Sequence, residues 1–188
     1  MDHFLRLAFP LAAAATLTGC VHMQIDETAP SLETLTLLRT QAVPQITLGE
    51  FKEVGGTSFA RNINVRGSTL RAPGGGNFAD FLKKSFQSEL VAAGTYAASS
   101  TTAITGTLEE SRATEDMAKG YASLGAIMAV SRDGTTVFSK RYRAETRWRS
   151  DFIGAIAIPE AFRQYNGLYS QLVRTVFADP EFIAALKK

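Results

Sequence analysis

The chain has a single cysteine, and its position limits what the rest of the sequence can fold into. Cys20 follows an apolar run from Leu7 to Leu17, and the basic Arg6 stands just before that run. A charged start, a short apolar stretch and small residues before a cut are typical of a secretory signal. We therefore expect residues 1–19 to be removed, leaving 169 of the 188 residues. Beyond Cys20 no thiol is left for a disulfide, so packing must stabilise the fold.

The residues around this cysteine, Leu17-Thr18-Gly19-Cys20, resemble the lipobox of bacterial lipoproteins. In that group the cysteine becomes the new N-terminus and carries the lipid, so the resemblance implies lipidation at Cys20 and a membrane as partner. Val21 stands where an inner-membrane retention signal would place Asp, which favours the periplasmic face of the outer membrane. The alternatives are an ordinary secretory signal or a transmembrane anchor, although the apolar run is well short of the roughly 20 residues of a spanning helix.

Histidine is as scarce as cysteine, and this restricts the possible chemistry. His3 lies in the expected signal and His22 lies two residues after Cys20, so the folded body has none. A Ser-His-Asp or Cys-His hydrolase site is thereby excluded from the body, and a zinc or iron site is disfavoured. We expect no enzymatic activity, no cofactor and no metal; a hydrolase that uses only carboxylates is the remaining enzymatic alternative. The net charge of +2 does not indicate a nucleic-acid partner.

The order of patterns predicts three segments and one fold class. Residues 1–19 are the expected signal, 20–44 a lipidated tether with some local structure, and 45–188 a single domain. We expect strands at residues 45–54, 103–108, 121–131 and 135–150, a helix over 77–93, a second helix from Pro159 and a short third helix from Pro180. This order predicts an α+β fold, with a mostly antiparallel sheet of four to five strands and two main helices packed on one face.

Local signals support the first helix and one hairpin. Asn77 can cap the helix, and Gly94 suits the left-handed residue that ends many helices. Apolar side chains three and four residues apart predict one buried stripe, formed by Phe78, Phe81, Leu82, Phe86 and Leu90. The pair Asp133-Gly134 predicts a tight turn between two strands.

Two other groups of residues invite a functional interpretation. The glycines at 74–76 precede a helix, where an anion can bind, but Asp80 would repel phosphate, and a loop is the alternative. The carboxylates Glu109-Glu110 and Glu115-Asp116 suggest acid–base work or calcium. Because adjacent residues of a strand point to opposite faces, each pair is weakened as a unit, and we expect a solvated turn over 109–119.

A row of arginines is the best candidate for a functional surface. Alternation along one strand places Arg141, Arg143, Arg147 and Arg149 on one face, where they could bind phosphate or carboxylate groups. Arg61, Arg66 and Arg71 would extend the patch if their loop folds over that face. The alternative is a solvated strand face that Glu145 partly neutralises.

The segment from Phe152 to Ile158 has no polar residue. We expect an apolar loop before the helix that begins at Pro159, where a missing backbone donor costs nothing. The loop is either buried beneath the sheet or exposed as a contact for a partner or lipid, and the sequence leaves both alternatives open.

The body resembles small periplasmic lipoproteins of Gram-negative bacteria grouped around YajG, the ABC-transport auxiliary lipoproteins and the N-terminal domain of the curli secretion lipoprotein. Besides the lipobox, four stretches carry the resemblance: residues 90–94 (LVAAG), 104–108 (ITGTL), 133–137 (DGTTV) and 172–182 (LVRTVFADPEF). It implies a sheet with two helices on one face and offers no catalytic residue. It also implies an accessory or assembly component of an envelope complex; the alternative is a binding module for an anionic lipid or glycan on the arginine face.

Overall fold

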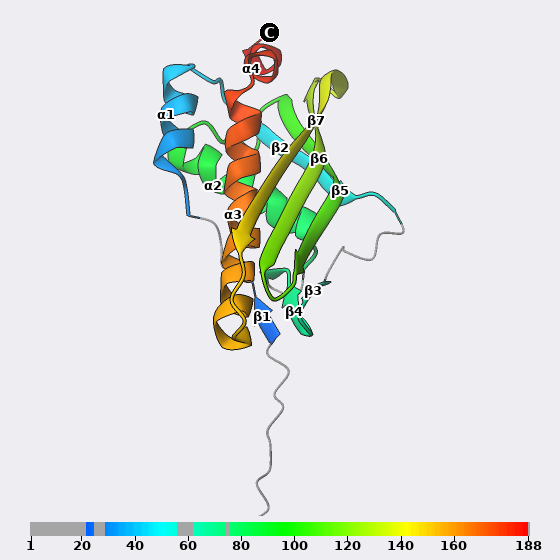
Figure 1. Ribbon diagram of the computed structural model, residues 1–188. Helices are drawn as coiled ribbons and strands as arrows, with labels where there is room; N and C mark the ends of the chain where they lie inside the picture. The colour runs from blue at the N-terminus through cyan, green and yellow to red at the C-terminus, as the bar shows by residue number, and fades with distance from the viewer. Residues whose placement is uncertain (1–21, 25–28, 56–61, 74–75, 188) are drawn as a thin grey trace, which may run out of the picture.

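The structure of the protein is a computed structural model that describes residues 22–24, 29–55, 62–73 and 76–187. The expected signal, the expected lipidation site Cys20, and Arg61 lie outside these ranges. A layer of helices packs against a long, twisted sheet (Figure 1).

The main sheet has four strands in the order β2-β5-β6-β7. Its strands are β2 (Thr47–Glu53), β5 (Thr102–Glu115), β6 (Lys119–Arg132) and β7 (Thr135–Arg149). The last three form an antiparallel meander, whereas β2 pairs parallel with β5. Parallel neighbours need a crossover connection, and helix α2 (Phe78–Ala93) lies between β2 and β5 in the sequence.

A small second sheet lies beside the main one. Its order is β1-β4-β3, formed by β1 (His22–Gln24), β4 (Ser68–Arg71) and β3 (Asn62–Val65). The hairpin of β3 and β4 buries Val65 and Leu70 in the common core, and β1 pairs parallel with β4.

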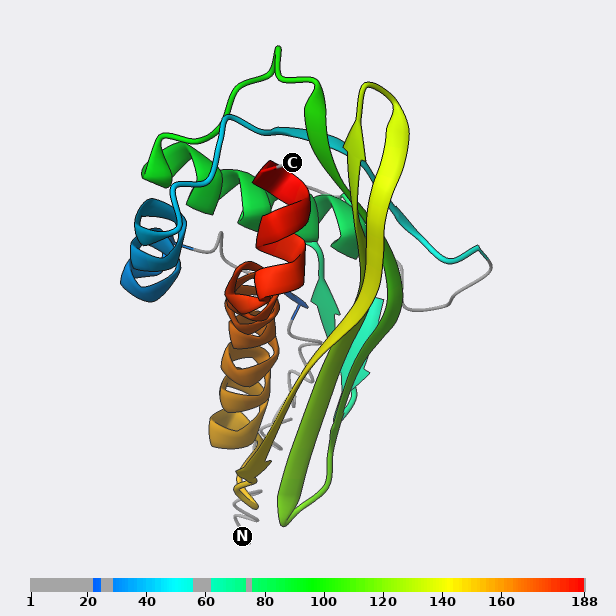
Figure 2. The same cartoon turned by 90° about the horizontal axis from the view of Figure 1, so that it is seen from above.

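Helix α2 and helix α3 (Gly154–Ala178) cover one face of the main sheet (Figure 2). All five apolar residues of the predicted α2 stripe are buried, and Phe81 packs its ring edge-on against Tyr169 of α3. The buried faces of α2 and α3 pack with apolar residues of the strands in one core cluster. The expected α+β fold, with two main helices on one face, is confirmed.

Local signals at element ends are also confirmed. The Asn77 side chain accepts a hydrogen bond from the backbone N–H of Asp80 at 2.7 Å, and Gly94 is left-handed with φ of 76°. Asp133 and Gly134 both have positive φ in the β6–β7 turn, as a tight hairpin requires.

Two element boundaries differ from the prediction. Strand β5 continues to Glu115, so the expected turn over 109–119 is mostly strand. Helix α3 begins at Gly154 rather than at Pro159, so residues 154–158 are its first turns and not a loop. A proline inside a helix removes one backbone hydrogen bond, and here that loss falls near the helix end.

Helix α1 (Leu32–Thr40) lies within the range expected to be a tether. It packs against α2 and α3 and buries Leu38. The Ser31 side chain caps α1, and the Ser31 backbone N–H donates to Glu89 Oε1 of α2 at 2.8 Å. Residues from Ser31 onward therefore pack as part of the folded body. The chain closes with α4 (Pro180–Lys187), which buries Phe182 and Leu186.

Candidate functional site

The predicted arginine row lies on the outer face, by which we mean the face of the main sheet turned away from α2 and α3. Strand β7 alternates as expected: Tyr142 and Ala144 are buried toward the helices, whereas Arg141, Arg143, Arg147 and Arg149 are exposed on the other side. The row therefore exists as one surface along a sheet edge. Arg66 and Arg71 belong instead to the small sheet.

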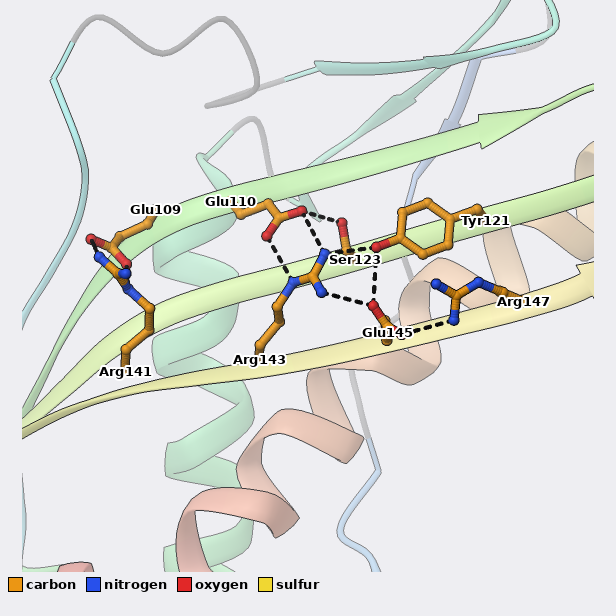
Figure 3. Close-up of polar contacts among 8 residues, drawn as sticks. All are labelled: Glu109, Glu110, Tyr121, Ser123, Arg141, Arg143, Glu145 and Arg147. Atoms are coloured by element: carbon orange, nitrogen blue, oxygen red, sulfur yellow. Dashed lines mark hydrogen bonds and ion pairs between the residues drawn. The ribbon is translucent and has the colours of Figure 1, made fainter.

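A β-bulge in β5 brings two acids onto this outer face. The register with β6 shifts between Leu108 and Glu110, so Glu109 is an extra residue in the ladder. Glu109 and Glu110 thereby face the same way, contrary to the expectation that neighbours point to opposite faces (Figure 3). The expected weakening of the pair is therefore wrong, because the bulge interrupts the alternation on which it depended.

The first of these acids neutralises Arg141. The guanidinium donates two hydrogen bonds to the Glu109 carboxylate, from Nε at 2.6 Å and from Nη2 at 3.0 Å. This fork geometry is the strong form of an arginine–carboxylate pair. Arg141 is thus held by a partner from two strands away.

Arg143 lies at the centre of a larger network. It donates to Glu110 at 3.0 Å, to Glu145 at 2.8 Å and to the Tyr121 hydroxyl at 2.7 Å. Ser123 also donates to Glu110 (Figure 3). Three residues from three strands therefore hold this guanidinium, and Ser123 holds one of them, Glu110.

Arg147 is the third arginine of the row that has an ion-pair partner. It donates to Glu145 at 2.8 Å, and its guanidinium lies 5.0 Å from the centre of the Tyr121 ring. Arg112 of β5 lies 5.6 Å from the same ring. Two cations on one aromatic ring make Tyr121 part of the surface, by cation–π attraction.

The hydrogen bonds and ion pairs of this network favour the charged form of its members. Hydrogen bonds from Arg143 lower the pKa of Glu110, and those from Arg147 and Tyr121 lower the pKa of Glu145. The Glu110 carboxylate in turn raises the pKa of Arg143. Both carboxylates thus stay ionised at neutral pH, and three arginines of the row are matched by three glutamates.

Arg149 differs from the other three arginines. Its guanidinium makes no hydrogen bond or ion pair with any residue in the described ranges. It lies at the end of β7, beside a hollow of about 780 Å³ where β5 turns into β6. Arg112, Lys119 and Arg147 also line this hollow.

The two acids at this hollow are already engaged. Glu115 accepts hydrogen bonds from Trp148 Nε1 at 3.0 Å and from Ser150 Oγ at 2.7 Å. Asp116 accepts from the backbone N–H groups of Ala118 and Lys119, both at 2.7 Å, which closes the β5–β6 turn. Both carboxylates keep their negative charge, because these donors are neutral, but four cations line the same hollow. We call this end of the sheet, formed by the β5–β6 turn and the end of β7, the tip.

The cations of the tip could bind an anionic group. Phosphate and carboxylate are the groups that arginine forks bind. Among the described residues, no group of three histidine, cysteine, aspartate or glutamate side chains is placed to hold a metal ion. The lining of the hollow combines four cations and the Trp148 indole with Thr114, Tyr121 and two carboxylates.

Arg112, Lys119 and Tyr121 also belong to this surface, although the sequence did not predict them there. Arg112 lies beyond residue 108, where the expected strand ended, and Lys119 lies before residue 121, where the next expected strand began. Tyr121 lies within an expected strand, but its register with β7 was not worked out. The signal that could have found them is the alternation of β6, in which Tyr121 pairs with Arg147.

The segment from Phe152 to Ile158 is divided between the core and the surface. Ala157 is buried, whereas Phe152, Ile153 and Ile156 are more than half exposed. Arg66 donates to the backbone carbonyls of Asp151 and Phe152 at 2.8 and 3.1 Å. Arg66, one of the arginines expected to extend the row, therefore binds the start of the segment from Phe152 to Ile158 instead. The glycines at 74 and 75 lie outside the described residues.

No helix of the described residues is both long enough and apolar enough to cross a membrane. No protein-family model matches the sequence, and no curated protein matches it either.

Solved structures do share the fold. The chain is similar to protein XCC0632 from Xanthomonas campestris, of the DUF330 family, with 12% identity and a TM-score of 0.55, over 89% of this chain and 97% of that one. At this identity the similarity concerns the fold alone. Two further structures align with TM-scores below 0.5, and no conclusion is drawn from them. They are hypothetical protein CT253 from Chlamydia trachomatis (10% identity, TM-score 0.49, 76% and 98% covered) and a minor lipoprotein from Acinetobacter baumannii (12% identity, TM-score 0.40, 72% and 92% covered).

Proposed function

We propose that this chain is a non-enzymatic lipoprotein, anchored through Cys20 at the periplasmic face of the outer membrane, and that it serves as an accessory component of an envelope complex. The observation that carries this proposal is the lone cysteine behind a short apolar run and the small pair Thr18-Gly19. The fold shared with XCC0632 is compatible with it. A mature lipoprotein carries several acyl chains, which suffice for stable anchoring.

The charges of the outer face support a protein as the partner. Arg141, Arg143 and Arg147 alternate with glutamates at ion-pair distance, so a free anion would have to displace a carboxylate. A protein surface with its own mixed charges can instead exchange pairs across an interface, which provides specificity more than affinity. The paired charges of the outer face therefore support the accessory role more than the binding of a small anion along the row.

The anchor is tested by comparing the natural chain with Cys20→Ser. We expect the natural chain to incorporate labelled palmitate and to sediment with outer membranes, and the variant to lose both properties. Equal palmitate incorporation in both chains would contradict lipidation at Cys20. Cross-linking of the anchored natural chain tests the accessory role, which a monomer without any cross-linked partner would contradict.

The second candidate is a binding module for an anionic lipid or glycan. The observation that favours it is Arg149, which lacks a partner among the described residues and faces the hollow. Replacing all four arginines of the row by serine should abolish binding of an anionic peptidoglycan fragment, measured by titration calorimetry. Arg149→Ser alone should remove most of it, whereas Arg141→Ser, the matched control, should leave it nearly unchanged. No binding of this fragment by the natural chain would eliminate the glycan as the ligand.

A further inference from the structure

Exposed apolar side chains gather at the tip. Eight large apolar residues are exposed in the described ranges, and four of them lie together here: Met117, Phe152, Ile153 and Ile156. Phe152 is 74% exposed and Met117 is 65% exposed. Three of the four line a second hollow of about 880 Å³ between the β5–β6 turn and the start of α3. Such a concentration of exposed apolar surface marks a contact site.

An ordered backbone presents these side chains. The Ser150 backbone N–H donates to the Ala118 carbonyl at 3.0 Å, which joins the β5–β6 turn to the end of β7. The Asp151 side chain accepts from the Ile153 N–H at 2.7 Å, and Arg66 binds the carbonyls of Asp151 and Phe152. The backbone that carries these apolar residues is therefore fixed by hydrogen bonds.

The expected anchor enters the fold at the same end of the molecule. His22 of β1 pairs with Thr69 of β4, and the two strands run parallel. The chain therefore reaches β1 from the side of the β3–β4 turn, which holds Arg66. Cys20 precedes His22 by two residues, a span of at most about 7 Å. Figure 1 shows β1 and the first turn of α3 at one end of the molecule.

The charge around the apolar patch suits a phospholipid surface. Lys119 and Arg149 flank Met117 and Phe152, and Arg149 has no ion-pair partner in the described part of the chain. Four acids also lie nearby. Glu160 forms an ion pair with Arg163, whereas Glu115, Asp116 and Asp151 accept hydrogen bonds from uncharged donors and keep their negative charge. Apolar residues bordered by free cations are the combination that binds an anionic membrane interface.

We propose that the tip is a second membrane contact, in which Phe152, Ile153, Ile156 and Met117 enter the headgroup region of the leaflet while Arg149 and Lys119 bind anionic headgroups. This inference rests on the proposed lipid anchor at Cys20. The anchor alone leaves the body free to rotate about its attachment. With the tip on the same leaflet, the body takes one orientation, and the β6–β7 turn points away from the bilayer.

The test measures the immersion depth of single sites in the lipidated full chain, reconstituted in vesicles of phosphatidylethanolamine and phosphatidylglycerol. Lipid occupies Cys20, so an introduced cysteine is the sole site for a nitroxide label. Ile153→Cys is the test site, and Val137→Cys, on β7 beside the β6–β7 turn, is the exposed control. We expect lipid-soluble oxygen to relax the label at 153 and a water-soluble nickel complex to relax the label at 137. A label at 153 that responds to nickel as the control does, or one shielded from both reagents by a protein contact, overturns the proposal.

The mass of the N-terminal peptide separates failure of the anchor from failure of the tip. If that peptide carries no lipid, the proposed function fails, and flotation of the same chain with these vesicles decides the tip contact alone. The double variant Phe152→Ser with Ile156→Ser should then bind at least about tenfold more weakly than the matched control Val91→Ser with Val137→Ser. Equal binding of the two variants, or no binding by the natural chain, overturns the inference.

Discussion

Gly120 is the residue on which the shape of the tip most depends. A Cβ atom at this position would lie 1.9 Å from Trp148 Cε2, far inside any real contact. The indole therefore lies flat against the backbone of β6, and its Nε1 reaches Glu115 on β5. Because Gly120 of β6 has no side chain, Trp148 of β7 can cross it and reach Glu115 of β5, which links three neighbouring strands.

We predict that Gly120→Ala displaces Trp148 and lowers the free energy of unfolding by about 1–3 kcal/mol. Trp148 is the only tryptophan, so a red shift of its emission reports the displacement directly. Gly167→Ala on α3 is the control, because its Cβ would meet no atom within 4 Å. That control should gain up to about 1 kcal/mol. Unchanged emission and stability in Gly120→Ala would contradict the role given to this glycine.

Single positions also show what a sequence can and cannot predict about the candidate site. The alternation of β7 placed the four arginines on one face correctly, because a period of two depends only on the strand itself. Their neutralisation by Glu109 and Glu110 could not be predicted, because it depends on a bulge. A bulge is set by the pairing of two strands, and one extra residue leaves little trace in a pattern.

Among the elements, the junction of α3 and α4 is tied to the sheet by one carboxylate, Asp179. Asp179 accepts hydrogen bonds from Tyr142 Oη at 2.6 Å and Lys140 Nζ at 2.8 Å, both from β7, and from the Glu181 backbone N–H at 2.9 Å. Burial alone would raise the pKa of Asp179, but the bonds from Lys140 and Tyr142 outweigh it and lower the pKa below its ordinary 3.8. One carboxylate thus caps α4 and ties it to the sheet edge.

We predict that Asp179→Asn lowers the free energy of unfolding at neutral pH by about 1–3 kcal/mol. Because folding lowers this pKa, the carboxylate stabilises the fold fully above pH 3.8, and the contribution is lost as the pH falls through the lower folded value. The difference between variant and natural chain, measured by denaturant unfolding, should therefore shrink at acid pH. Asp133→Asn in the β6–β7 turn is the charge-matched control and should cost little. A difference that stays constant with pH would contradict this account.

The elements that were predicted well are those with a strong internal period. The stripe of α2 and the Asp133-Gly134 turn depend on nearby residues, and both were found. The boundaries of β5 and α3 were not, because polar β5 residues become strand only by pairing with β6, and α3 continues back through Pro159 by packing Ala157. The parallel pairing of β2 with β5 is a property of the whole sheet and has no local signal.

At the scale of the whole molecule, α1 shows that the folded body begins well before residue 45. Leu38 on its inner face is 1% exposed, whereas Leu32 on its outer face is 81% exposed. The Arg174 guanidinium of α3 also pairs with Glu33 at 2.6 Å. The chain between the expected lipid and the domain is thus shorter than the sequence suggested.

We predict that Leu38→Ala lowers the free energy of unfolding by about 2–4 kcal/mol, because it opens a cavity between α1 and the helices beneath it. Leu32→Ala makes the same chemical change on the exposed face and should have almost no effect. Thermal or denaturant unfolding of the two variants separates the outcomes. Equal stability of both would mean that α1 does not contribute to the core.

Helix α3 gives the molecule a fixed length. Its 25 residues, at about 1.5 Å each, span about 37 Å between the apolar tip and the corner at Asp179. If the tip lies on the membrane as proposed, this length places α4 and the β6–β7 turn far beyond the reach of lipid headgroups. The body would then act as a spacer that presents one end to a partner at a constant distance from the surface beneath it.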